Sequence, residues 1–560
     1  MPFLQFKGKS AIESYHHVVP HHRLEFDEKL SVLAKGEKPG LNGNLIIEGD
    51  NLLALKALLP THAGRIKCVY IDPPYNTGNE GWVYNDNLTQ PQFKEWIGQT
   101  VGKEGEDACR HDKWCCMMYP RLELLKQLLH PDEGIIFVSV DDNEICNLRL
   151  IMDEVFGAEN WFATLCRRAM HTVRNTSKDF NLNADFVVVY ASNKAWHGAR
   201  KDRYIRVPMD KAGDYPHDDH DGKEFYKLDP LHARNYYKPY EYTFKNGVVW
   251  KAPQGRYPAY SEETLEEMDE AGEIVFTGVE PKAKRYLKDV QEGRPPDAFL
   301  SPEDVGFNSN GTTLLRQILG GGAFPQPKPV ELIHHLLLMV RDKNAIVLDS
   351  FAGSGTIGHA VLAMNKEDKG NRTFILVQQK HDSKEDEKNN MNICENITFQ
   401  RVRRVIRGYA YPKRKGGKDI PLVKVDGLGG SFTYARVGDR LFGEYRDLGK
   451  KLPSFEELAK YIFYTETSRE CDLKKVDAES GFIGATDASG GTSYYLLYTP
   501  DRKADREMSL VTLGEIAARD KSRNWVIYCE KIWLHQDQLR KFEQEHGKRI
   551  RPMVVPFQLK

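Results

Sequence analysis

An apolar run that stops at two consecutive prolines constrains the fold more than any other feature of the sequence. It lies in the segment RIKCVYIDPPYNTG, residues 65–78. The β-branched and aromatic residues before the prolines predict a short buried strand of a parallel sheet. Proline has no amide hydrogen to donate to a strand ladder, so the chain must turn away at Asp72-Pro73-Pro74-Tyr75. Ligands of open α/β sheets bind at the carboxyl ends of the strands, and we therefore expect these four residues at a ligand-binding edge.

The residue types at this turn suit a flat base that carries an exocyclic amine. The Asp72 carboxylate and the Pro73 carbonyl are hydrogen-bond acceptors, one for each hydrogen of the amine. The ring of Tyr75 offers a face on which a base can stack. The same residues are also compatible with an ordinary turn, because motifs of this length recur by chance.

A second predicted strand ends in a glycine-rich segment, AIVLDSFAGSGTIG, residues 345–358. Gly353 and Gly355 let the backbone approach a ligand closely, and the helix that follows presents amide donors at its first turn. The segment does not complete the GxGxxG dinucleotide pattern, and no GxxxxGKS or GxxxxGKT sequence occurs, so ATP hydrolysis is not indicated. Asp50 follows the apolar stretch NLIIE and is able either to cap the next helix or to bind a purine.

Strand and helix patterns alternate through most of the chain, and this alternation predicts a doubly wound, Rossmann-like α/β sheet. The predicted strands are residues 44–48, 66–71, 134–139, 185–191, 346–348 and 373–377, and the predicted helices are residues 52–59, 114–129, 148–155, 331–341 and 356–364. We also expect an amphipathic helix at residues 24–33. Near the C-terminus we expect a helix at 455–463 and strands at 494–498 and 525–529.

Composition shifts divide the chain into five segments. We predict an N-terminal arm (1–43), a first half of the core (44–191), an insertion (192–310), a second half of the core (311–410) and a C-terminal α+β domain (411–560). The insertion is dense in aromatic and basic side chains, which suit base stacking and phosphate contacts. The alternative for this segment is a variable insertion with a mixed β fold.

The net charge of −1 gives the chain no global field that would attract nucleic acid, so any such surface has to be a local patch. Arg167, Arg168, Arg174 and Lys178 are locally concentrated and form one candidate patch. The alternative is an ordinary solvated surface.

Cysteine and histidine placement favours a protein without a metal site. The nine cysteines are scattered without a CxxC pair, which indicates reduced thiols in a cytoplasmic protein. The histidines of HHVVPHH, residues 16–22, lack a carboxylate or thiol at ligand spacing, and we expect them in a solvated arm. We recognise neither a signal peptide nor a membrane-spanning run.

The two motifs together resemble those of amino-methylating DNA methyltransferases. Asp72-Pro73-Pro74-Tyr75 is similar to their catalytic motif, and Phe351-Ala352-Gly353-Ser354-Gly355 is similar to their S-adenosylmethionine motif. Their order, with the catalytic motif first, resembles the permuted β class. The stretches GDNLLALKAL, YPRLELL, EGIIFVSVDDNE and PKPVELI extend the likeness, over residues 42–380, to the modification subunits of type III restriction–modification systems.

The resemblance implies a sheet of seven strands, one of them antiparallel, with cofactor and target base side by side at its carboxyl edge. It makes residues 44–191 the catalytic half of the core, residues 192–310 the target-recognition insertion and residues 311–410 the cofactor half. It implies that an adenine is flipped out of duplex DNA. The N6 amine of this adenine would donate to Asp72 and to the Pro73 carbonyl, and its ring would stack on Tyr75. Pro74 completes the catalytic motif. The residues expected at S-adenosylmethionine are Asp50, Asn51, Asp72, Lys328, Asp349, Phe351, Ala352, Gly353, Ser354, Gly355, Thr356 and Gln378. Those expected at DNA are Arg121, Arg167, Arg168, Arg174, Lys178 and Arg256.

Two positions depart from the pattern of this family. Where its members often carry His-Glu-Tyr, this chain has Ala184-Asp185-Phe186, which keeps only the acid. An acid for the cofactor ribose often follows the strand at 373–377, but Gln378 and Gln379 stand there and Asp382 comes later.

The expected reaction is methyl transfer to N6 of adenine in duplex DNA, in the modification component of a restriction–modification or phage-defence system. Transfer to N4 of cytosine is an alternative with the same geometry, whereas C5 transfer needs a cysteine nucleophile and no Pro-Cys pair occurs. An RNA or protein-amide methyltransferase and a catalytically silent DNA-recognition subunit are further alternatives. The expected partners are duplex DNA, a second copy of the chain in a homodimer and a separate nuclease or helicase subunit, with no membrane.

Overall fold

The structure is a computed structural model that describes residues 4–77, 110–171, 180–208, 215–220, 225–278, 280–287, 293–321, 324–412, 422–441, 453–486, 491–499 and 506–555. The chain divides into two compact units. The first is formed by residues 1–203 and 297–560, and the second, which we call the insertion unit, is Tyr204–Pro296. The insertion unit lies inside the segment 192–310 that the sequence sets apart.

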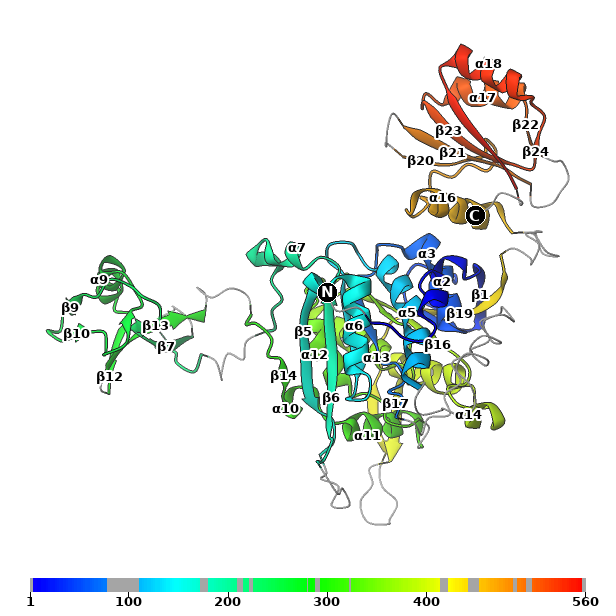
Figure 1. The fold of residues 1–560 in the computed structure, drawn as a ribbon. Helices are drawn as coiled ribbons and strands as arrows, with labels where there is room; N and C mark the ends of the chain where they lie inside the picture. Colours follow the sequence, from blue (N-terminus) through cyan, green and yellow to red (C-terminus); the bar gives the residue numbers. More distant parts are fainter. Residues whose placement is uncertain are drawn as a thin grey trace. The chain divides into compact units, whose positions relative to one another are not determined.

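The first unit is built on a ten-stranded mixed sheet (Figure 1). In spatial order its strands are β1 (His22–Val32), β19 (Phe432–Arg440), β2 (Leu45–Glu48), β16 (Thr373–Gln378), β15 (Ile346–Asp349), β3 (Cys68–Ile71), β4 (Ile135–Val140), β6 (Ala184–Ala191), β5 (Trp161–Arg168) and β14 (Phe299–Leu300). Within the run from β2 to β5, β6 is antiparallel to both of its neighbours and the other pairings are parallel. The predicted seven-stranded sheet with one antiparallel strand is therefore confirmed, with further strands added at both edges.

Helices cover both faces of this sheet. The helices of this part of the chain are α1 (Lys9–Ile12), α2 (Tyr15–Val18), α3 (Asn51–His62), α5 (Arg110–Leu128), α6 (Ile145–Phe156), α7 (Lys194–Gly198), α10 (Pro302–Val305), α11 (Asn308–Leu319), α12 (Val330–Leu338), α13 (Thr356–Asp368), α14 (Lys384–Lys388) and α15 (Gln400–Arg407). Alternate strand residues such as Val69 and Ile136 share one hydrophobic cluster with α3, α5 and α6. On the other face α13 packs so closely that a β-carbon at Gly358 would lie 3.1 Å from Leu376. This layering is that of a doubly wound fold.

Residues 22–32 form strand β1, so the amphipathic helix predicted at 24–33 is wrong. Leu24, Phe26, Leu30 and Val32 also recur with a period of two, which is the period of a strand. β1 pairs antiparallel with β19, which comes from the segment assigned to the C-terminal domain. The arm and β19 therefore extend the main sheet.

The histidine-rich part of the arm is packed against the core, not solvated as predicted. His16 is buried, and Lys56 of α3 donates a hydrogen bond to its carbonyl at 2.8 Å. Burial, followed by the charges of His17 and Lys56, lowers the pKa of His16 to about 4. The His16 ring is therefore neutral at physiological pH, as a buried aromatic ring without a carboxylate partner should be.

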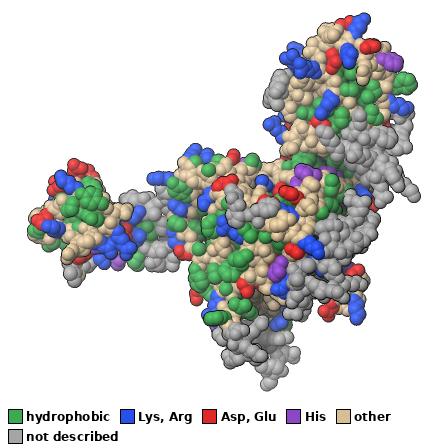
Figure 2. Space-filling model, viewed as in Figure 1, with side chains coloured by type: hydrophobic (Ala, Val, Ile, Leu, Met, Phe, Trp, Pro, Cys, Tyr) green, Lys and Arg blue, Asp and Glu red, His purple; other side chains and the backbone are tan. Residues whose placement is uncertain are grey.

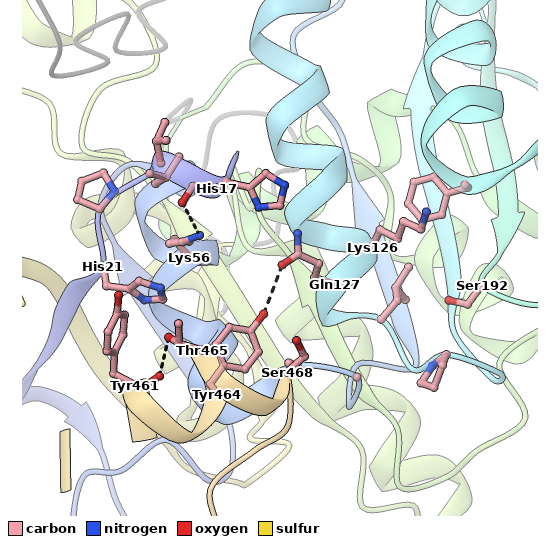
Figure 3. Close-up of a pocket in the computed structure, with 18 of the residues that line it drawn as sticks. His17, His21, Lys56, Lys126, Gln127, Ser192, Tyr461, Tyr464, Thr465 and Ser468 are labelled. Atoms are coloured by element: carbon pink, nitrogen blue, oxygen red, sulfur yellow. Dashed lines mark hydrogen bonds between the residues drawn. The ribbon is translucent and has the colours of Figure 1, made fainter. Parts of the chain in front are cut away.

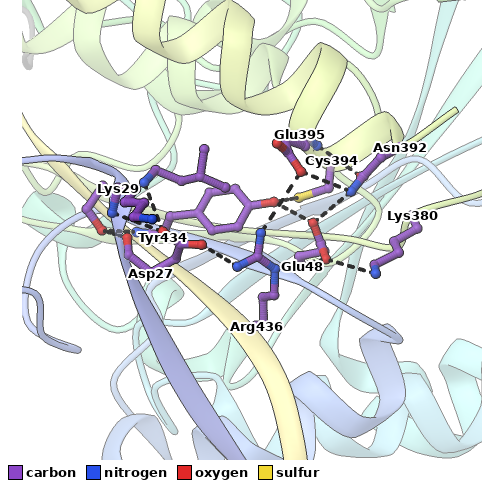
Figure 4. A network of polar contacts seen from close by, with 11 residues as sticks. Asp27, Lys29, Glu48, Lys380, Asn392, Cys394, Glu395, Tyr434 and Arg436 are labelled. Carbon is purple, nitrogen blue, oxygen red and sulfur yellow. Dashed lines mark hydrogen bonds and ion pairs between the residues drawn. The ribbon is translucent and has the colours of Figure 1, made fainter.

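A buried polar network ties the added strands to the sheet (Figure 4). Glu48, at the end of β2, accepts hydrogen bonds from Tyr434 at 2.7 Å and from Asn392 at 2.9 Å, and it lies 3.2 Å from Arg436 Nε. Arg436 also pairs with Asp27 of β1. Burial raises the pKa of Glu48, but the hydrogen bonds from Asn392 and Tyr434 and the charge of Arg436 outweigh it and leave the pKa below its ordinary value. The ionised Glu48 thus joins β1, β2 and β19.

The C-terminal part of the first unit is a smaller α/β layer. Its elements are α16 (Phe455–Thr467), β20 (Phe482–Thr486), β21 (Thr492–Leu497), β22 (Glu507–Met508), α17 (Leu510–Arg519), β23 (Asn524–Cys529), β24 (Lys531–Ile532), α18 (Gln536–His546) and β25 (Arg549–Val554). β21, β23 and β25 are parallel, and β20 is antiparallel to β21. The predicted helix at 455–463 and the strands at 494–498 and 525–529 correspond to α16, β21 and β23.

The insertion unit is a small mixed fold with mostly short strands. It contains β7 (Tyr226–Pro230), β8 (His232–Ala233), β9 (Glu241–Thr243), β10 (Val249–Lys251), β11 (Tyr257–Pro258), α9 (Glu262–Glu270), β12 (Ile274–Thr277) and β13 (Glu280–Tyr286). β13 pairs antiparallel with β12 on one side and β7 on the other. Across both units, the described helices include none that is long and apolar enough to cross a bilayer.

Candidate active site

The two motifs come together because their strands are neighbours. β15 pairs in parallel with β3, with Leu348 opposite Val69. The proline corner (residues 72–75) and the glycine loop (residues 351–356) therefore leave the sheet at the same edge. Burial, and then the charge of nearby Asp72, raises the pKa of Asp349 well above its ordinary value. The catalytic and cofactor motifs expected from the sequence thus lie side by side.

The proline corner is held from outside by side chains that do not use the Pro73 carbonyl. Trp114 Nε1 donates a hydrogen bond to the Pro74 carbonyl at 2.7 Å. Asn76, in the left-handed region with φ of 58°, donates to the fully buried carboxylate of Glu144. Within the described residues the Pro73 carbonyl accepts no hydrogen bond. Among these described residues, the Pro73 carbonyl is thus an acceptor without a partner, directly after Asp72.

Glycine is required at two positions of the glycine loop. Gly353 and Gly355 have φ of 50° and 73°. A β-carbon on Gly353 would lie 3.1 Å from the ring of Phe324, and one on Gly355 would lie 3.1 Å from the methyl group of Thr398. The Gly353 amide donates to Gln378 Oε1 at 2.6 Å, at the end of β16. The loop is therefore bent into one shape that no other residue type adopts without strain.

A buried arginine fixes the rest of this loop. Arg401 Nη1 donates to the hydroxyls of Ser354 and Thr356, each at 2.8 Å. Burial lowers the pKa of Arg401 to about 10, so the guanidinium stays charged at neutral pH. Phe351 and Ala352 are buried at the start of the loop. The loop thus has the rigidity that a pre-organised binding site needs.

Asp50 and Asn51 brace the beginning of the glycine loop. Asp50 caps α3, because its Oδ1 accepts from the Leu52 amide at 2.9 Å, which matches the structural alternative for this residue. Asn51 Nδ2 donates to the Ser350 carbonyl at 2.9 Å. Arg121 Nε donates to Asn51 Oδ1 at 2.5 Å, and its Nη2 lies 3.6 Å from Asp50. These side chains hold α3 against the end of β15.

A carboxylate lies beside the glycine loop although position 378 is glutamine. Gln378 Nε2 donates to Asp382 Oδ1 at 2.8 Å, and Gln379 Nε2 donates to it at 3.2 Å. Burial raises the pKa of Asp382 to about 6. The Asp382 carboxylate, four residues after Gln378, is thus joined to the glycine loop through that glutamine.

Lys328 is the centre of a charged cluster at the proline corner. Its Nζ lies 3.2 Å from Asp72 Oδ1 and 3.7 Å from Asp185 Oδ2. It donates a hydrogen bond to the Tyr75 hydroxyl and lies 4.5 Å from the centroid of the Tyr75 ring. Arg167 Nη2 lies 3.0 Å from the same oxygen of Asp185. The Lys328 side chain, expected at the cofactor, thus contacts the catalytic motif.

The residues expected at DNA divide into buried and exposed ones. Arg121 and Arg167 are 4% and 1% exposed and bind protein groups, so neither fits the phosphate contact predicted for it. Arg168, the next residue of β5, is exposed. Arg256, in the insertion unit, is partly exposed. Arg174 and Lys178 lie outside the described residues.

On the face shown in Figure 2, basic and acidic side chains are interspersed, so neither sign of charge dominates this face. This distribution agrees with the net charge of −1. A DNA surface on this protein therefore has to be local.

Several side chains that build the site have no signal in the local sequence. Trp114 of α5 and Glu144, directly before α6, hold the proline corner, and Thr398 and Arg401 hold the glycine loop, all from helical regions distant along the chain. Only the packing of those helices brings them to the motifs. Among the described residues, no group of three or more His, Cys, Asp or Glu side chains is arranged to hold a metal ion.

A hollow of about 1190 Å³ lies at the amino ends of the strands, opposite the edge that carries the proline corner and the glycine loop (Figure 3). It is lined by Lys56 of α3, by residues that precede β3 and β4, such as Gly64 and Pro131, and by Tyr464 of α16. Tyr464 donates a hydrogen bond to Gln127 at 3.3 Å there. No residue of the proline corner or the glycine loop lines this hollow, so it is separate from the candidate active site.

Comparison with known proteins gives consistent matches. A family model described as DNA methylase matches residues 66–389. The StyLTI Mod subunit of a type III restriction-modification enzyme from Salmonella typhimurium is 32% identical over 382 residues, which cover 65% of this chain and 57% of that protein. The EcoPI Mod subunit of Escherichia phage P1, also of type III, is 31% identical over 384 residues, covering 60% of this chain and 57% of that protein. The type II methyltransferase M.KpnI of Klebsiella pneumoniae is 27% identical over 351 residues, covering 60% of this chain and 80% of that protein. The chain therefore spans less than two thirds of the length of the two type III relatives.

Proposed function

The chain belongs to the DNA methylase family, and on this premise we propose that it transfers a methyl group from S-adenosylmethionine to the N6 amine of adenine in duplex DNA. We further propose that it acts as the modification component of a restriction–modification system.

The observation that carries the proposal is a pair of acceptors next to a rigid glycine loop. Asp72 Oδ1 is buried without a hydrogen bond, and the neighbouring Pro73 carbonyl accepts none from the described residues. Two such acceptors match the two hydrogens of one exocyclic amine. The glycine loop, fixed by Gln378 and Arg401, lies at the same sheet edge. A base held at the acceptors would therefore have its amine beside whatever the loop binds.

The two acceptors would activate the amine by orienting it. The lone pair of an aryl amine is delocalised into the ring, which makes the nitrogen a poor nucleophile. Hydrogen bonds from both of its hydrogens, to Asp72 and to the Pro73 carbonyl, favour a pyramidal nitrogen whose lone pair points away from both acceptors. The Asp72 carboxylate also stabilises the positive charge that the nitrogen gains and is the nearest acceptor for the proton that it then loses.

The residues around the glycine loop fit S-adenosylmethionine. The backbone at Gly353 and Gly355 has no side chain that would keep a ligand at a distance. The Asp382 carboxylate, with its pKa raised to about 6 by burial, is ionised at neutral pH and can accept hydrogen bonds from ribose hydroxyls. When bound, this cofactor supplies an electrophilic methyl group.

The insertion unit is the part that we propose to recognise the DNA sequence. Its segment 234–238, RNYYK, exposes two aromatic side chains, Tyr236 and Tyr237, between the basic residues Arg234 and Lys238. Exposed aromatics next to basic residues can stack on bases and contact phosphates. Arg168 of the first unit is a second candidate for phosphate contact.

The names of two relatives support the role in a restriction–modification system, since both are Mod subunits of type III enzymes. By analogy, we propose that a separate subunit provides the restriction activity. A homodimer and a cytoplasmic location remain predictions from the sequence.

Single-molecule sequencing of DNA from cells that express the protein tests this function. Wild-type protein is expected to leave N6-methyladenine at one sequence motif, and Asp72→Ala is expected to leave none. N4-methylcytosine at the motif would instead support the cytosine alternative, which needs the same two acceptors. A DNA without modified bases would refute the proposed function.

A further inference from the structure

We propose that Lys328 is a positioning residue whose ammonium occupies the target-amine position of the resting site and moves onto Asp185 when a base enters. The proposal rests on the proposed function, because the group that displaces the ammonium is the exocyclic amine of the extruded base. The proposal goes beyond that function because it identifies the group that the base displaces, which is the Lys328 ammonium.

The Lys328 ammonium already engages both features that we assign to base recognition. Its Nζ lies 3.2 Å from Asp72 Oδ1, the acceptor proposed for the amine. The same atom lies 4.5 Å from the centroid of the Tyr75 ring, within the range of a cation–π contact, and donates to the Tyr75 hydroxyl. A base that stacks on Tyr75 and whose amine donates to Asp72 Oδ1 therefore has to replace this ammonium at that oxygen.

A cation at this position stabilises the resting site. Asp72 Oδ1 is buried and accepts no hydrogen bond, so without Lys328 this oxygen would be shielded from water and unpaired. Lys328 is itself only 8% exposed and also needs a carboxylate partner. Each charge thus compensates for the burial of the other.

Asp185 gives the ammonium a second place to bind. Asp185 Oδ2 lies 3.7 Å from Lys328 Nζ and 3.0 Å from Arg167 Nη2. The ammonium can therefore release Asp72 without becoming unpaired. Its release is required for transfer, because a positive charge beside the amine would oppose the charge that develops on the nitrogen.

The main chain of Lys328 is fixed on both sides, so the movement is confined to the side chain. Thr356 Oγ1, in the glycine loop, donates to the Lys328 carbonyl at 3.3 Å. Opposite, Gly311 of α11 packs so tightly that a β-carbon there would lie 2.2 Å from the Pro327 carbonyl oxygen. A long, unbranched side chain on a fixed backbone suits a shift between two nearby carboxylates.

Base extrusion, measured with 2-aminopurine placed directly beside the methylated adenine of duplex DNA, which keeps its N6 amine, tests the proposal. Sequencing of modified bases made by the wild-type protein identifies that adenine. Lys328→Met is expected to raise the 2-aminopurine emission of the saturated complex at least twofold, because the competitor for Asp72 and Tyr75 is gone. Asp185→Asn is expected to lower the emission at least twofold, because the ammonium then stays on Asp72.

Lys67→Met is the matched control. Lys67 also bridges two carboxylates, Glu133 and Asp342, each at 2.6 Å, but it lies at the amino end of β3. Its loss is expected to leave the emission at the wild-type value. Lys328→Arg keeps the positive charge and is expected to give an emission no higher than that of the wild type, which separates the effect of charge from an effect on folding.

Calorimetric titration with S-adenosylmethionine completes the test. The dissociation constants of Lys328→Met and Asp185→Asn for this cofactor are expected to lie within twofold of the wild-type value. Unchanged emission with weakened cofactor binding in Lys328→Met would overturn the proposal and assign Lys328 to the cofactor. Lower emission in that variant would overturn it too, since Lys328 would then support the extruded base. A wild-type protein that modifies no DNA would refute the proposed function, which is a separate outcome.

Discussion

The Gly353 amide donates a hydrogen bond of 2.6 Å to Oε1 of Gln378, which joins the glycine loop to the end of the neighbouring strand β16. The nitrogen of the same side chain donates to Asp382 at 2.8 Å. One glutamine therefore orients both the loop and the carboxylate beside it. The cofactor half of the site is held as one hydrogen-bonded piece, next to a proline corner that is held independently by Trp114 and Glu144.

Replacing Asp72 by asparagine is expected to lower the single-turnover rate of DNA methylation at least 100-fold, a loss of about 2.7 kcal/mol of transition-state stabilisation. Asparagine keeps the size of the side chain but lacks the charge that stabilises the amine nitrogen. S-adenosylmethionine binding, measured by calorimetry, is expected to persist because the glycine loop is fixed by other residues.

Asp141→Asn is the control for this variant. Asp141 directly follows the adjacent strand β4, and its carboxylate accepts hydrogen bonds from the amide and the side chain of Asn143. Its replacement is expected to leave the rate at the wild-type value. Equal losses in the two variants would contradict a specific role for Asp72.

Gly355→Ala is expected to weaken S-adenosylmethionine binding at least tenfold and to lower the free energy of unfolding by about 1–3 kcal/mol. Gly355 has φ of 73°, and its β-carbon would meet Thr398 at 3.1 Å, so the loop has to change shape. Gly321→Ala serves as the control, because a β-carbon there meets no atom within 4 Å. Calorimetry and thermal unfolding of both variants provide the comparison, and equal effects would argue against a shape requirement at Gly355.

The pH dependence of stability should reveal Asp382. Burial raises its pKa from 3.8 to about 6, so the folded protein holds this proton more tightly than the unfolded chain does. The free energy of unfolding is therefore expected to fall as pH rises from about 4 to about 6, by at most about 3 kcal/mol from this group. Asp382→Asn is expected to unfold at a higher temperature than wild type at pH 7.5 and at the same temperature at pH 4. The exposed residue Asp426, replaced by asparagine, should produce no such pH-dependent difference.

Arg168 and Arg167 are expected to differ sharply in the salt dependence of DNA binding. Arg168→Gln should reduce the slope of log K against log salt by about 0.9, the value for one lost phosphate contact. Arg167→Leu should leave the slope unchanged but lower the free energy of unfolding by about 3–5 kcal/mol, because it leaves the partly buried Asp185 without one of its two cations. A reduced slope for Arg167→Leu, or none for Arg168→Gln, would contradict this assignment.

The contrast between these two arginines explains why the basic patch predicted from the sequence is wrong for Arg167. The sequence pattern predicts no strand at residues 161–168 and therefore places both arginines on one surface. In a strand successive side chains point to opposite sides, so Arg167 enters the core and Arg168 faces solvent. The patch prediction is wrong for Arg167 because strand β5 is not predicted from the sequence, and not because of the residue types.

The central strands and the meeting of the two motifs were predictable because each depends on local pattern. Buried apolar runs end at Asp72 and at Asp349, and parallel strands bring their carboxyl ends to one edge. Strand β1 was not predictable in this way, because Leu24, Phe26, Leu30 and Val32 fit more than one period and its partner β19 is about 400 residues away. The contact between Lys328 and Asp72 has the same cause, since it depends on tertiary packing of segments far apart in the chain.

The most direct test of the central claim is mass spectrometry of nucleosides from duplex DNA incubated with the purified protein and S-adenosylmethionine that carries an isotopically labelled methyl group. The account predicts labelled N6-methyladenine with the wild-type protein and none with Asp72→Asn. Label that appears only on another base, or labelled N6-methyladenine formed equally well by both proteins, would contradict it.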